Sequence, residues 1–332
     1  MVGLDGLRAL AIGLVLLDHL WSGHFDGGGI GVVIFFVLSG YLITSLLTRE
    51  RAREGRIGLG AFYLRRALRL WPALIAMLLG TIALGASARS ALVAGTYLTD
   101  LANISGRLVL PYGHTWSLAV EEQFYLVWPL CLLAILALPA RSRNGVLLAG
   151  ILLSIAGCAT WTILSLRNTG TIGLGIFSPL WQGHGLLLGC LLALVGQSWH
   201  VRRPGVVVLG ASAIQLVIAV VASVLVARHL ALLWNVAAEL VAMLMIVCLR
   251  SLETGPYTWR PVVWMGQRSY AIYLWHLPLI ILFGLHGWWH AAVLGVAASF
   301  VLAEISGRFV EAPFLRLKDR LPRSRRAVAA VT

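Results

Sequence analysis

Long apolar runs, separated by short loops that carry arginine, dominate the hydrophobic pattern of this sequence. A helix that crosses a bilayer needs about 20 mostly apolar residues. Ten runs approach this length, and they lie near residues 7–23, 29–48, 70–86, 118–138, 146–166, 177–197, 205–227, 230–249, 269–286 and 289–310. The pattern therefore predicts an all-α fold, a polytopic transmembrane helix bundle of about ten spans.

Two apolar stretches depart from this regular pattern. The first span ends in Asp18 and His19, and no small-residue cleavage pattern follows it. We therefore expect it to be retained and packed inside the bundle rather than removed as a signal peptide. The run from Ser90 to Tyr97 is too short to cross a bilayer and predicts a loop or an interfacial helix.

The distribution of arginines predicts the orientation of the chain. The loops after the second, fourth, sixth and eighth spans and the C-terminal tail carry most of the basic residues, whereas the opposite loops carry only Arg89, Arg107, Arg167 and Arg228. Cytoplasmic loops of membrane proteins carry an excess of Lys and Arg. We therefore expect both termini in the cytoplasm, residues 1–315 as one membrane domain, and residues 316–332 as a basic, partly disordered tail.

Composition supports lipid as the main solvent. Of 332 residues, 59% are hydrophobic and 12% are charged, whereas soluble domains carry about 25% charged residues. The net charge of +13 comes almost wholly from arginines in short loops, which indicates positive-inside topology rather than nucleic-acid binding. The four cysteines lie inside apolar runs without metal-ligand spacing, so we expect neither a metal site nor a disulfide.

Ionisable residues at membrane depth indicate function because they are costly there. Arg8 and His19 are eleven residues apart, so they share one helical face at a separation of about 16 Å along the axis. Asp18 points about 100° away from His19 and is not assigned to orient its imidazole. The alternative for His19 is a structural histidine that bonds a neighbouring helix, which is the interpretation we give to the isolated His184 and His276.

A basic segment leads into the third span. Arg66 and Arg69 are three residues apart and share a helical face that enters the membrane from the cytoplasmic side, with Arg65 beside them. Guanidinium groups match phosphate oxygens bidentately, so two converging arginines favour a phosphate site. Binding of lipid headgroups is the alternative.

Two adjacent carboxylates, Glu121 and Glu122, lie at the start of the fourth span. One alternative for this pair is purely structural, because the helix dipole stabilises acidic residues near a helix N-terminus. Glu121 and Tyr125 are four residues apart and share a face, whereas Glu122 points elsewhere. One carboxylate is therefore expected to be structural while the other faces a cavity.

Taken in order, these segments resemble the acyltransferase-3 family of membrane-embedded O-acyltransferases. The resemblance rests on Leu4–Ala9 with His19, Phe35–Leu42, Arg65–Pro72, Thr115–Leu118 with Glu121–Tyr125, Ser269–Tyr270 with Tyr273–His276, and Glu311–Phe314. It covers nearly the whole chain. No single motif is decisive, but the ordered set is highly specific.

The resemblance implies transfer of an acyl group, often acetyl from acetyl-CoA as co-substrate, to a hydroxyl of a carbohydrate, a cell-envelope glycan or a macrolide-type acceptor at a bacterial plasma membrane. No tightly bound cofactor is expected. A histidine with a pKa of about 6.5 suits proton abstraction from an alcohol, so His19 is expected to be the general base. The other expected site residues are Arg8 and one of Glu121 and Glu122 for catalysis, Arg65, Arg66 and Arg69 for the CoA phosphates, and Asp18, Ser39, His114, Trp116 and Tyr125 for the acceptor.

Two other classes of protein fit parts of the pattern. A proton-coupled transporter or flippase also has many spans with buried ionisable residues, but this sequence has no internal repeat. A glycan-binding assembly protein without chemistry does not need a basic nucleotide pocket near a buried histidine. Some members of the family carry an extracytoplasmic hydrolase-like domain. The pattern of spans leaves no room for one, so we expect no two-stage relay within this polypeptide.

Overall fold

The computed structural model describes residues 1–21, 23–169, 177–224, 231–284 and 290–320, and over these residues it is all-α with no strand. The α-helices are α1 (Val2–Leu20), α2 (Gly28–Glu54), α3 (Leu59–Ala83), α4 (Ala88–Gly95), α5 (Thr99–Ile104), α6 (Trp116–Ala137), α7 (Ala140–Thr169), α8 (Pro179–Val195), α9 (Pro204–Val224), α10 (Ala231–Leu249), α11 (Arg260–Gln267), α12 (Ser269–Gly284), α13 (Ala291–Ile305) and α14 (Ala312–Arg320). Short 3-10 turns are η1 (Gly113–Thr115), η3 (Gly196–Ser198) and η5 (Pro256–Thr258), and one π-helical turn, η6 (Ser306–Glu311), joins α13 to α14.

Seven helical segments among the described residues are long and apolar enough to cross a bilayer. They are Gly28–Glu54, Leu59–Ala83, Gly113–Ala137, Arg141–Ser165, Pro204–Val224, Leu232–Leu249 and Ala291–Leu317. Helix α12 is apolar but shorter, α8 has 17 residues, and α1 carries charged residues within its 19. The all-helical fold is thus confirmed, with seven candidate membrane spans among the described residues. Ten spans and two cytoplasmic termini stay predictions.

The third span begins earlier in the chain than the predicted range of 70–86. Helix α3 begins at Leu59, and the loop before it comprises only residues 55–58. Gly55, with a φ of 73°, ends α2 in the left-handed conformation that favours glycine. The arginines Arg65, Arg66 and Arg69 therefore lie on α3 and not in a loop. The apolar pattern does not predict the first turns of α3, because these turns carry arginines. A helix continues through such polar residues without interruption.

The short apolar stretch near Ser90 forms the eight-residue helix α4 rather than a loop. Ser87 is the N-cap of α4, and its side chain accepts a hydrogen bond from the Ser90 backbone amide. At the other end of the chain, α14 continues to Arg320, so the predicted tail is helical over its first residues. The rest of that tail, 321–332, lies outside the described residues.

Helix α2 is the most enclosed long helix of the bundle and packs against α1, α8 and α10. In its apolar window, 78% of the residues are buried. Helix α8 approaches it so closely that a Cβ at Gly40 would collide with the Leu186 backbone, and one at Gly189 with the Val37 backbone. Small residues allow such close approach in membranes, where van der Waals packing holds helices together.

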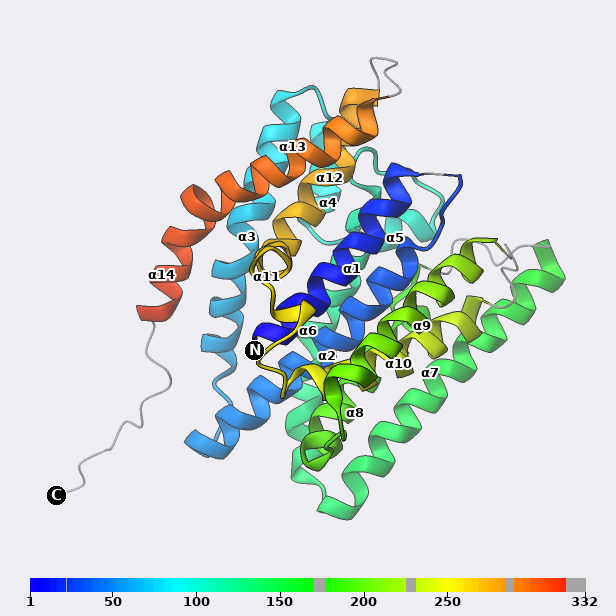
Figure 1. The fold of residues 1–332 in the computed structure, drawn as a ribbon, viewed down its shortest axis with the longest axis vertical. Coiled ribbons are helices and arrows are strands. Elements are labelled where there is room, and N and C mark those ends of the chain that lie inside the picture. The colour runs from blue at the N-terminus through cyan, green and yellow to red at the C-terminus, as the bar shows by residue number, and fades with distance from the viewer. Residues whose placement is uncertain (22, 170–176, 225–230, 285–289, 321–332) are drawn as a thin grey trace.

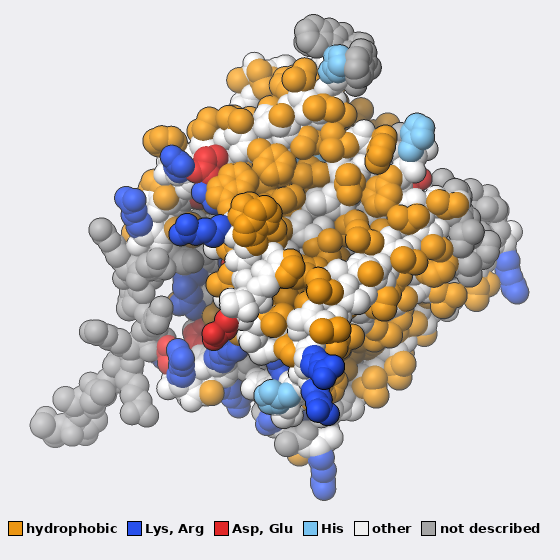
Figure 2. Space-filling model, viewed as in Figure 1, with side chains coloured by type: hydrophobic (Ala, Val, Ile, Leu, Met, Phe, Trp, Pro, Cys, Tyr) orange, Lys and Arg blue, Asp and Glu red, His pale blue; other side chains and the backbone are white. Residues whose placement is uncertain are grey.

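Helix α1 passes through the middle of the bundle, with α3 and α14 on one side and α7 on the other (Figure 1). Apolar side chains cover most of the face in Figure 2, whereas most of the visible Lys and Arg gather along its left and lower edges. Exposed side chains such as Leu79 and Leu153, at 62% and 73% exposure, are suited to lipid contact. This face of the bundle is therefore mainly apolar with a basic margin, as is typical of a membrane protein.

Candidate active site

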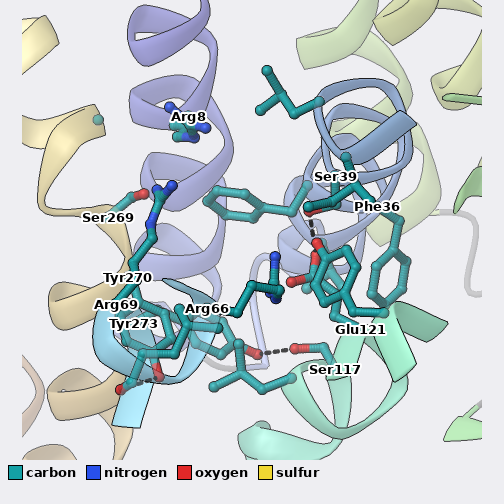
Figure 3. A pocket seen from close by; sticks show the side chains of 18 of the residues that line it. Arg8, Phe36, Ser39, Arg66, Arg69, Ser117, Glu121, Ser269, Tyr270 and Tyr273 are labelled. Atoms are coloured by element: carbon teal, nitrogen blue, oxygen red, sulfur yellow. Dashed lines mark hydrogen bonds between the residues drawn. The ribbon is translucent and has the colours of Figure 1, made fainter. Parts of the chain in front are cut away.

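A cavity of about 250 Å³ lies among α1, α2, α3, α6 and α12. The guanidinium groups of Arg8, Arg66 and Arg69 approach it from α1 and α3 (Figure 3). We call it the arginine cavity. Three cationic side chains beside one cavity favour an anionic ligand there.

The three arginines differ in the negatively charged partners that they already have in the structure. Arg8 forms an ion pair with Asp5, one helical turn away, which also lines the cavity. Arg69 forms no hydrogen bond or ion pair with any residue that the structure describes. Its guanidinium is therefore the one most available to an incoming anion, and Arg8 is available if Asp5 releases it.

Arg66 is held on two sides. Its Nη2 donates to Glu122 Oε1 at 2.6 Å, and its guanidinium carbon lies 3.5 Å from the centre of the Tyr125 ring. An ion pair and a cation–π contact together restrict the side chain to one position. Arg66 is thus preorganised at the cavity, with Glu122 as its support.

The adjacent carboxylates have different surroundings. Glu121 lines the arginine cavity, and its Oε1 accepts a hydrogen bond from Ser39 Oγ at 2.8 Å (Figure 3). Glu122 does not line the cavity and contacts Arg66 instead. Consecutive residues of a helix point about 100° apart, which separates the two side chains.

Arg65 does not reach the cavity. Its Nη2 lies 3.2 Å from Oε2 of Glu50, on the other side of the α2–α3 turn. The same Glu50 carboxylate accepts from the Gly58 amide through Oε1. This arrangement ties the start of α3 to α2 and gives Arg65 a structural contact.

A second cavity, of about 440 Å³, lies along the same helices toward the C-terminal end of α1. Asp18, His19, His114 and Trp116 line it. We call it the histidine cavity. His19 Nδ1 lies 2.8 Å from the Val15 carbonyl oxygen.

This contact decides the tautomer of His19. A carbonyl oxygen only accepts, so Nδ1 of the neutral ring carries the hydrogen and Nε2 keeps its lone pair. The Val15 backbone, and not Asp18, therefore orients the imidazole. An imidazole nitrogen that keeps its lone pair, on a residue that lines a cavity, can take a proton from a ligand.

Two further histidines surround His19. The ring centroid of His276 lies 4.9 Å from that of His19, and the ring centroid of His114 lies 5.1 Å from that of His276. Nδ1 of His276 donates to the Tyr273 carbonyl oxygen at 2.6 Å. Neither ring nitrogen of His114 has a hydrogen-bond partner among the described residues.

The structure places His276, which the sequence predicts to be a packing residue, in ring contact with His19. Its place in the Tyr273–His276 motif was the available signal, but an isolated histidine on an apolar helix does not reveal its neighbours. His184, by contrast, lies outside both cavities. Its Nδ1 is 2.6 Å from Oε1 of Glu239, and both side chains are almost fully buried.

The wall of the histidine cavity that faces Trp116 is aromatic. The Trp116 ring centroid lies 5.3 Å from that of Phe177, and both residues line the cavity. Asn103 and the exposed Arg107 add polar groups to the same lining. Aromatic surface with a few polar groups is typical of a small-molecule site.

The expected site residues are thus divided between two spaces. The arginine cavity takes Arg8, Ser39, Arg66, Arg69, Glu121 and Tyr125, the histidine cavity takes Asp18, His19, His114 and Trp116, and Arg65 and Glu122 line neither. The structure does not bring Arg8 and His19 into one cavity, since eleven residues of α1 keep them about 16 Å apart along the axis.

Residues 1–305 match the family model described as an acyltransferase domain. The chain belongs to this family, and the resemblance inferred from the motifs is confirmed. No solved structure matches it.

Among curated proteins, the chain is 34% identical to the peptidoglycan O-acetyltransferase OatA of Listeria monocytogenes, over 93% of this chain and 55% of that protein. It is 32% identical to the putative peptidoglycan O-acetyltransferase YrhL of Bacillus subtilis, over 94% of this chain and 54% of that one. A putative O-acetyltransferase of Staphylococcus aureus is 29% identical, over 95% and 57% respectively. The chain spans about half the length of the curated relatives it matches.

Proposed function

We propose that this chain is a membrane O-acetyltransferase that moves an acetyl group from acetyl-CoA to a hydroxyl of a cell-envelope glycan. The observation that carries the proposal is the adjacency of two cavities, one lined by three arginines and the other by His19, whose Nε2 bonds none of the described residues. Membership of an acyltransferase family supports the reaction class. The names of the relatives favour a peptidoglycan-type acceptor.

The donor fits the arginine cavity by charge. The phosphates of acetyl-CoA are anionic, and guanidinium groups bind phosphate oxygens through paired hydrogen bonds. Arg69 supplies an uncommitted guanidinium, while Arg66 is held in place by Glu122. The predicted orientation places this cavity toward the cytoplasm, where acyl-CoA is found.

The acceptor fits the histidine cavity by chemistry. Its hydroxyl would donate to His19 Nε2, while Trp116 and Phe177 contact the apolar face of a sugar ring. Asp18 and His114 line the same space and are available to bond other hydroxyls.

The transfer then balances without any further reactant. His19 Nε2 takes the proton of the acceptor hydroxyl, and the oxygen attacks the thioester carbonyl carbon. The C–S bond breaks, an ester C–O bond remains, and the CoA thiolate receives the proton from His19. The chain thus needs to hold the thioester and the hydroxyl together where the two cavities meet.

The alternative functions have less support. A macrolide-type acceptor rests on the general resemblance alone. A proton-coupled transporter or flippase would also explain buried ionisable residues, but its class is not that of the family to which the chain belongs.

The test uses the full chain in lipid nanodiscs with acetyl-CoA labelled in its acetyl group and chitotetraose as a soluble glycan acceptor. We expect base-labile label on the glycan with the wild type and none with His19→Ala. Absence of labelled glycan with the wild type, together with proton-driven uptake of chitotetraose into proteoliposomes, would replace the enzyme by a carrier.

A further inference from the structure

The arginine and histidine cavities follow one another along the same helices. Helix α1 contributes Arg8 to the first and His19 to the second, and α6 contributes Glu121 to the first and Trp116 to the second. Helices α1, α2, α6 and α12 line both cavities, so the two cavities follow one another along these four helices.

One face of α2 shows this succession most directly. Gly28 lines the histidine cavity, Val32 lines both cavities, and Phe36, Ser39 and Ile43 line the arginine cavity. Spacings of three and four residues place these positions on a single helical stripe. The stripe is continuous, and Val32 is the position at which it changes from one cavity to the other.

The opposite side of this boundary is Tyr273 of α12. Val32 and Tyr273 are the two described residues that line both cavities, and they belong to one buried apolar cluster. Their exposed fractions are 9% and 6%. Their side chains therefore form the boundary between the two cavities, which we call the constriction.

Neither side of the constriction is free to move aside. The Tyr273 hydroxyl donates to the His114 carbonyl oxygen at 2.8 Å. It also accepts from Ser117 Oγ at 2.8 Å (Figure 3). Val32 is β-branched, and such a side chain has one strongly preferred χ1 rotamer in a helix. The width of the constriction is therefore set by the sizes of these two side chains, because neither side chain readily changes its position.

We propose that the acyl group of the donor passes between Val32 and Tyr273, and that this constriction selects the acyl group by size. Val32 is then the residue that limits the acyl chain to about the length of acetyl. The inference rests on the proposed function, because the thioester of a donor held by arginines must reach an acceptor beside His19. The acyl group is the part of the donor that passes Val32 and Tyr273. A longer chain would have to overlap the Val32 methyl groups or displace a doubly hydrogen-bonded tyrosine.

The test compares Val32→Ala with Val33→Ala. Val33 is the matched control, because it is the adjacent valine, is 2% exposed and packs into a different apolar cluster without lining either cavity. Each protein is supplied with acetyl-CoA, propionyl-CoA or butyryl-CoA and chitotetraose. One methylene in an apolar pocket changes specificity by about 10–200-fold. We expect Val32→Ala to raise the ratio of butyryl to acetyl transfer by about tenfold or more, and Val33→Ala to leave it at the wild-type value.

A variant that narrows the constriction should change the acyl-chain ratio in the opposite direction. Val32→Ile adds one methyl group, so it should lower propionyl and butyryl transfer further while retaining more of the acetyl transfer. Equal acyl-chain ratios in Val32→Ala, Val33→Ala and wild type, with active acetyl transfer in all three, would overturn the constriction and leave the proposed function intact. Absence of transfer from every acyl-CoA by the wild type would instead overturn the proposed function, and the constriction with it.

Discussion

The imidazole rings of His19 and His276 meet edge to face with their centroids 4.9 Å apart, although α1 and α12 lie near opposite ends of the chain. Each ring bonds a backbone carbonyl of its own helix through Nδ1, that of Val15 for His19 and that of Tyr273 for His276. The orientation of the His19 ring is therefore restricted from two directions, by its own helix and by α12.

His19 is expected to be indispensable for transfer. His19→Ala should lower turnover by about 10²–10⁴-fold, because the acceptor hydroxyl loses its general base, while binding of acetyl-CoA in the other cavity is retained. His19→Gln keeps a hydrogen-bonding side chain but cannot take the proton, so it should be nearly as inactive. The measurement is acetyl transfer to chitotetraose beside equilibrium binding of labelled acetyl-CoA. Near-wild-type turnover of His19→Gln would make His19 structural and direct the search for the base to Glu121, Glu122 and His114.

His276 is expected to act on turnover through the position of His19. His276→Ala should lower kcat by up to about 10²-fold, because a loosely held base spends less time in the reactive geometry. KM for acetyl-CoA should not change, since His276 lines neither cavity. His276→Phe restores a ring against His19 and should recover part of kcat. Equal kcat for the wild type and His276→Ala would show that the contact has no positioning role.

The arginines of α3 are expected to contribute unequally to acetyl-CoA binding. Arg69→Ala should weaken acetyl-CoA binding by about tenfold or more, because a hydrogen bond to a charged group contributes about 1.5–3 kcal/mol. Arg69→Lys should restore only part of it, since the planar fork is lost. Arg65→Ala, on the same helix but paired with Glu50, is the matched control and should bind normally. Unchanged binding in Arg69→Ala would favour the lipid-headgroup alternative.

Arg66→Ala should have a second effect that Arg69→Ala lacks. It should weaken donor binding and also lower thermal stability, because Glu122 would remain half-buried without its ion pair. The double variant Arg66→Ala/Glu122→Gln removes the uncompensated carboxylate and should recover stability without recovering binding. Thermal aggregation in detergent and acetyl-CoA binding separate the two effects. A double variant that also regains binding would contradict a donor role for Arg66.

Asp100 is expected to make stability depend on pH. Its side chain is fully buried on α5, outside the candidate spans, and accepts from Gln123 Nε2 at 3.0 and 3.1 Å. Burial raises the pKa of this carboxyl, so the folded protein holds the proton more tightly than the unfolded chain does. The free energy of unfolding should therefore fall as the pH rises from the unfolded pKa, about 3.9, through the raised folded pKa.

Asp100→Asn should remove this part of the pH dependence, because the amide keeps an acceptor for Gln123 without gaining a charge. Asp26→Asn is the matched control, since Asp26 is exposed, and should keep the parental profile. Melting temperatures in detergent over this pH range provide the measurement. Parallel profiles for Asp100→Asn and the wild type would contradict the raised pKa.

The orientation is testable without any activity. Because most basic residues lie on one side of the predicted spans, a reporter fused after Thr332 should be active only in the cytoplasm. A fusion after Arg107, in a predicted outer loop, should behave in the opposite way and serves as the control. A signal from the Thr332 fusion outside the cytoplasm would reverse the orientation and remove the cytoplasmic access of the arginine cavity.

The sequence by itself determined the class of fold and the residues worth attention. Apolar length predicted membrane helices, because the thickness of the bilayer imposes a length on every span. Helical spacing predicted that Glu121 and Glu122 point in different directions, because successive residues of a helix differ by about 100°. The ordered motifs indicated the family. These properties depend on residues close together in the sequence, so the sequence alone is sufficient to infer them.

Only the tertiary structure decided how those residues are grouped. The separation of Arg8 from His19 into two cavities, the position of His276 beside His19, and the shared lining of Val32 and Tyr273 all depend on which helices pack together. Nothing in the local sequence specifies contacts between α1 and α12, because lipid-facing and protein-facing apolar side chains look alike in a membrane helix. The pairing of helices is a property of the whole bundle, and it groups polar residues from distant parts of the sequence around two adjacent cavities.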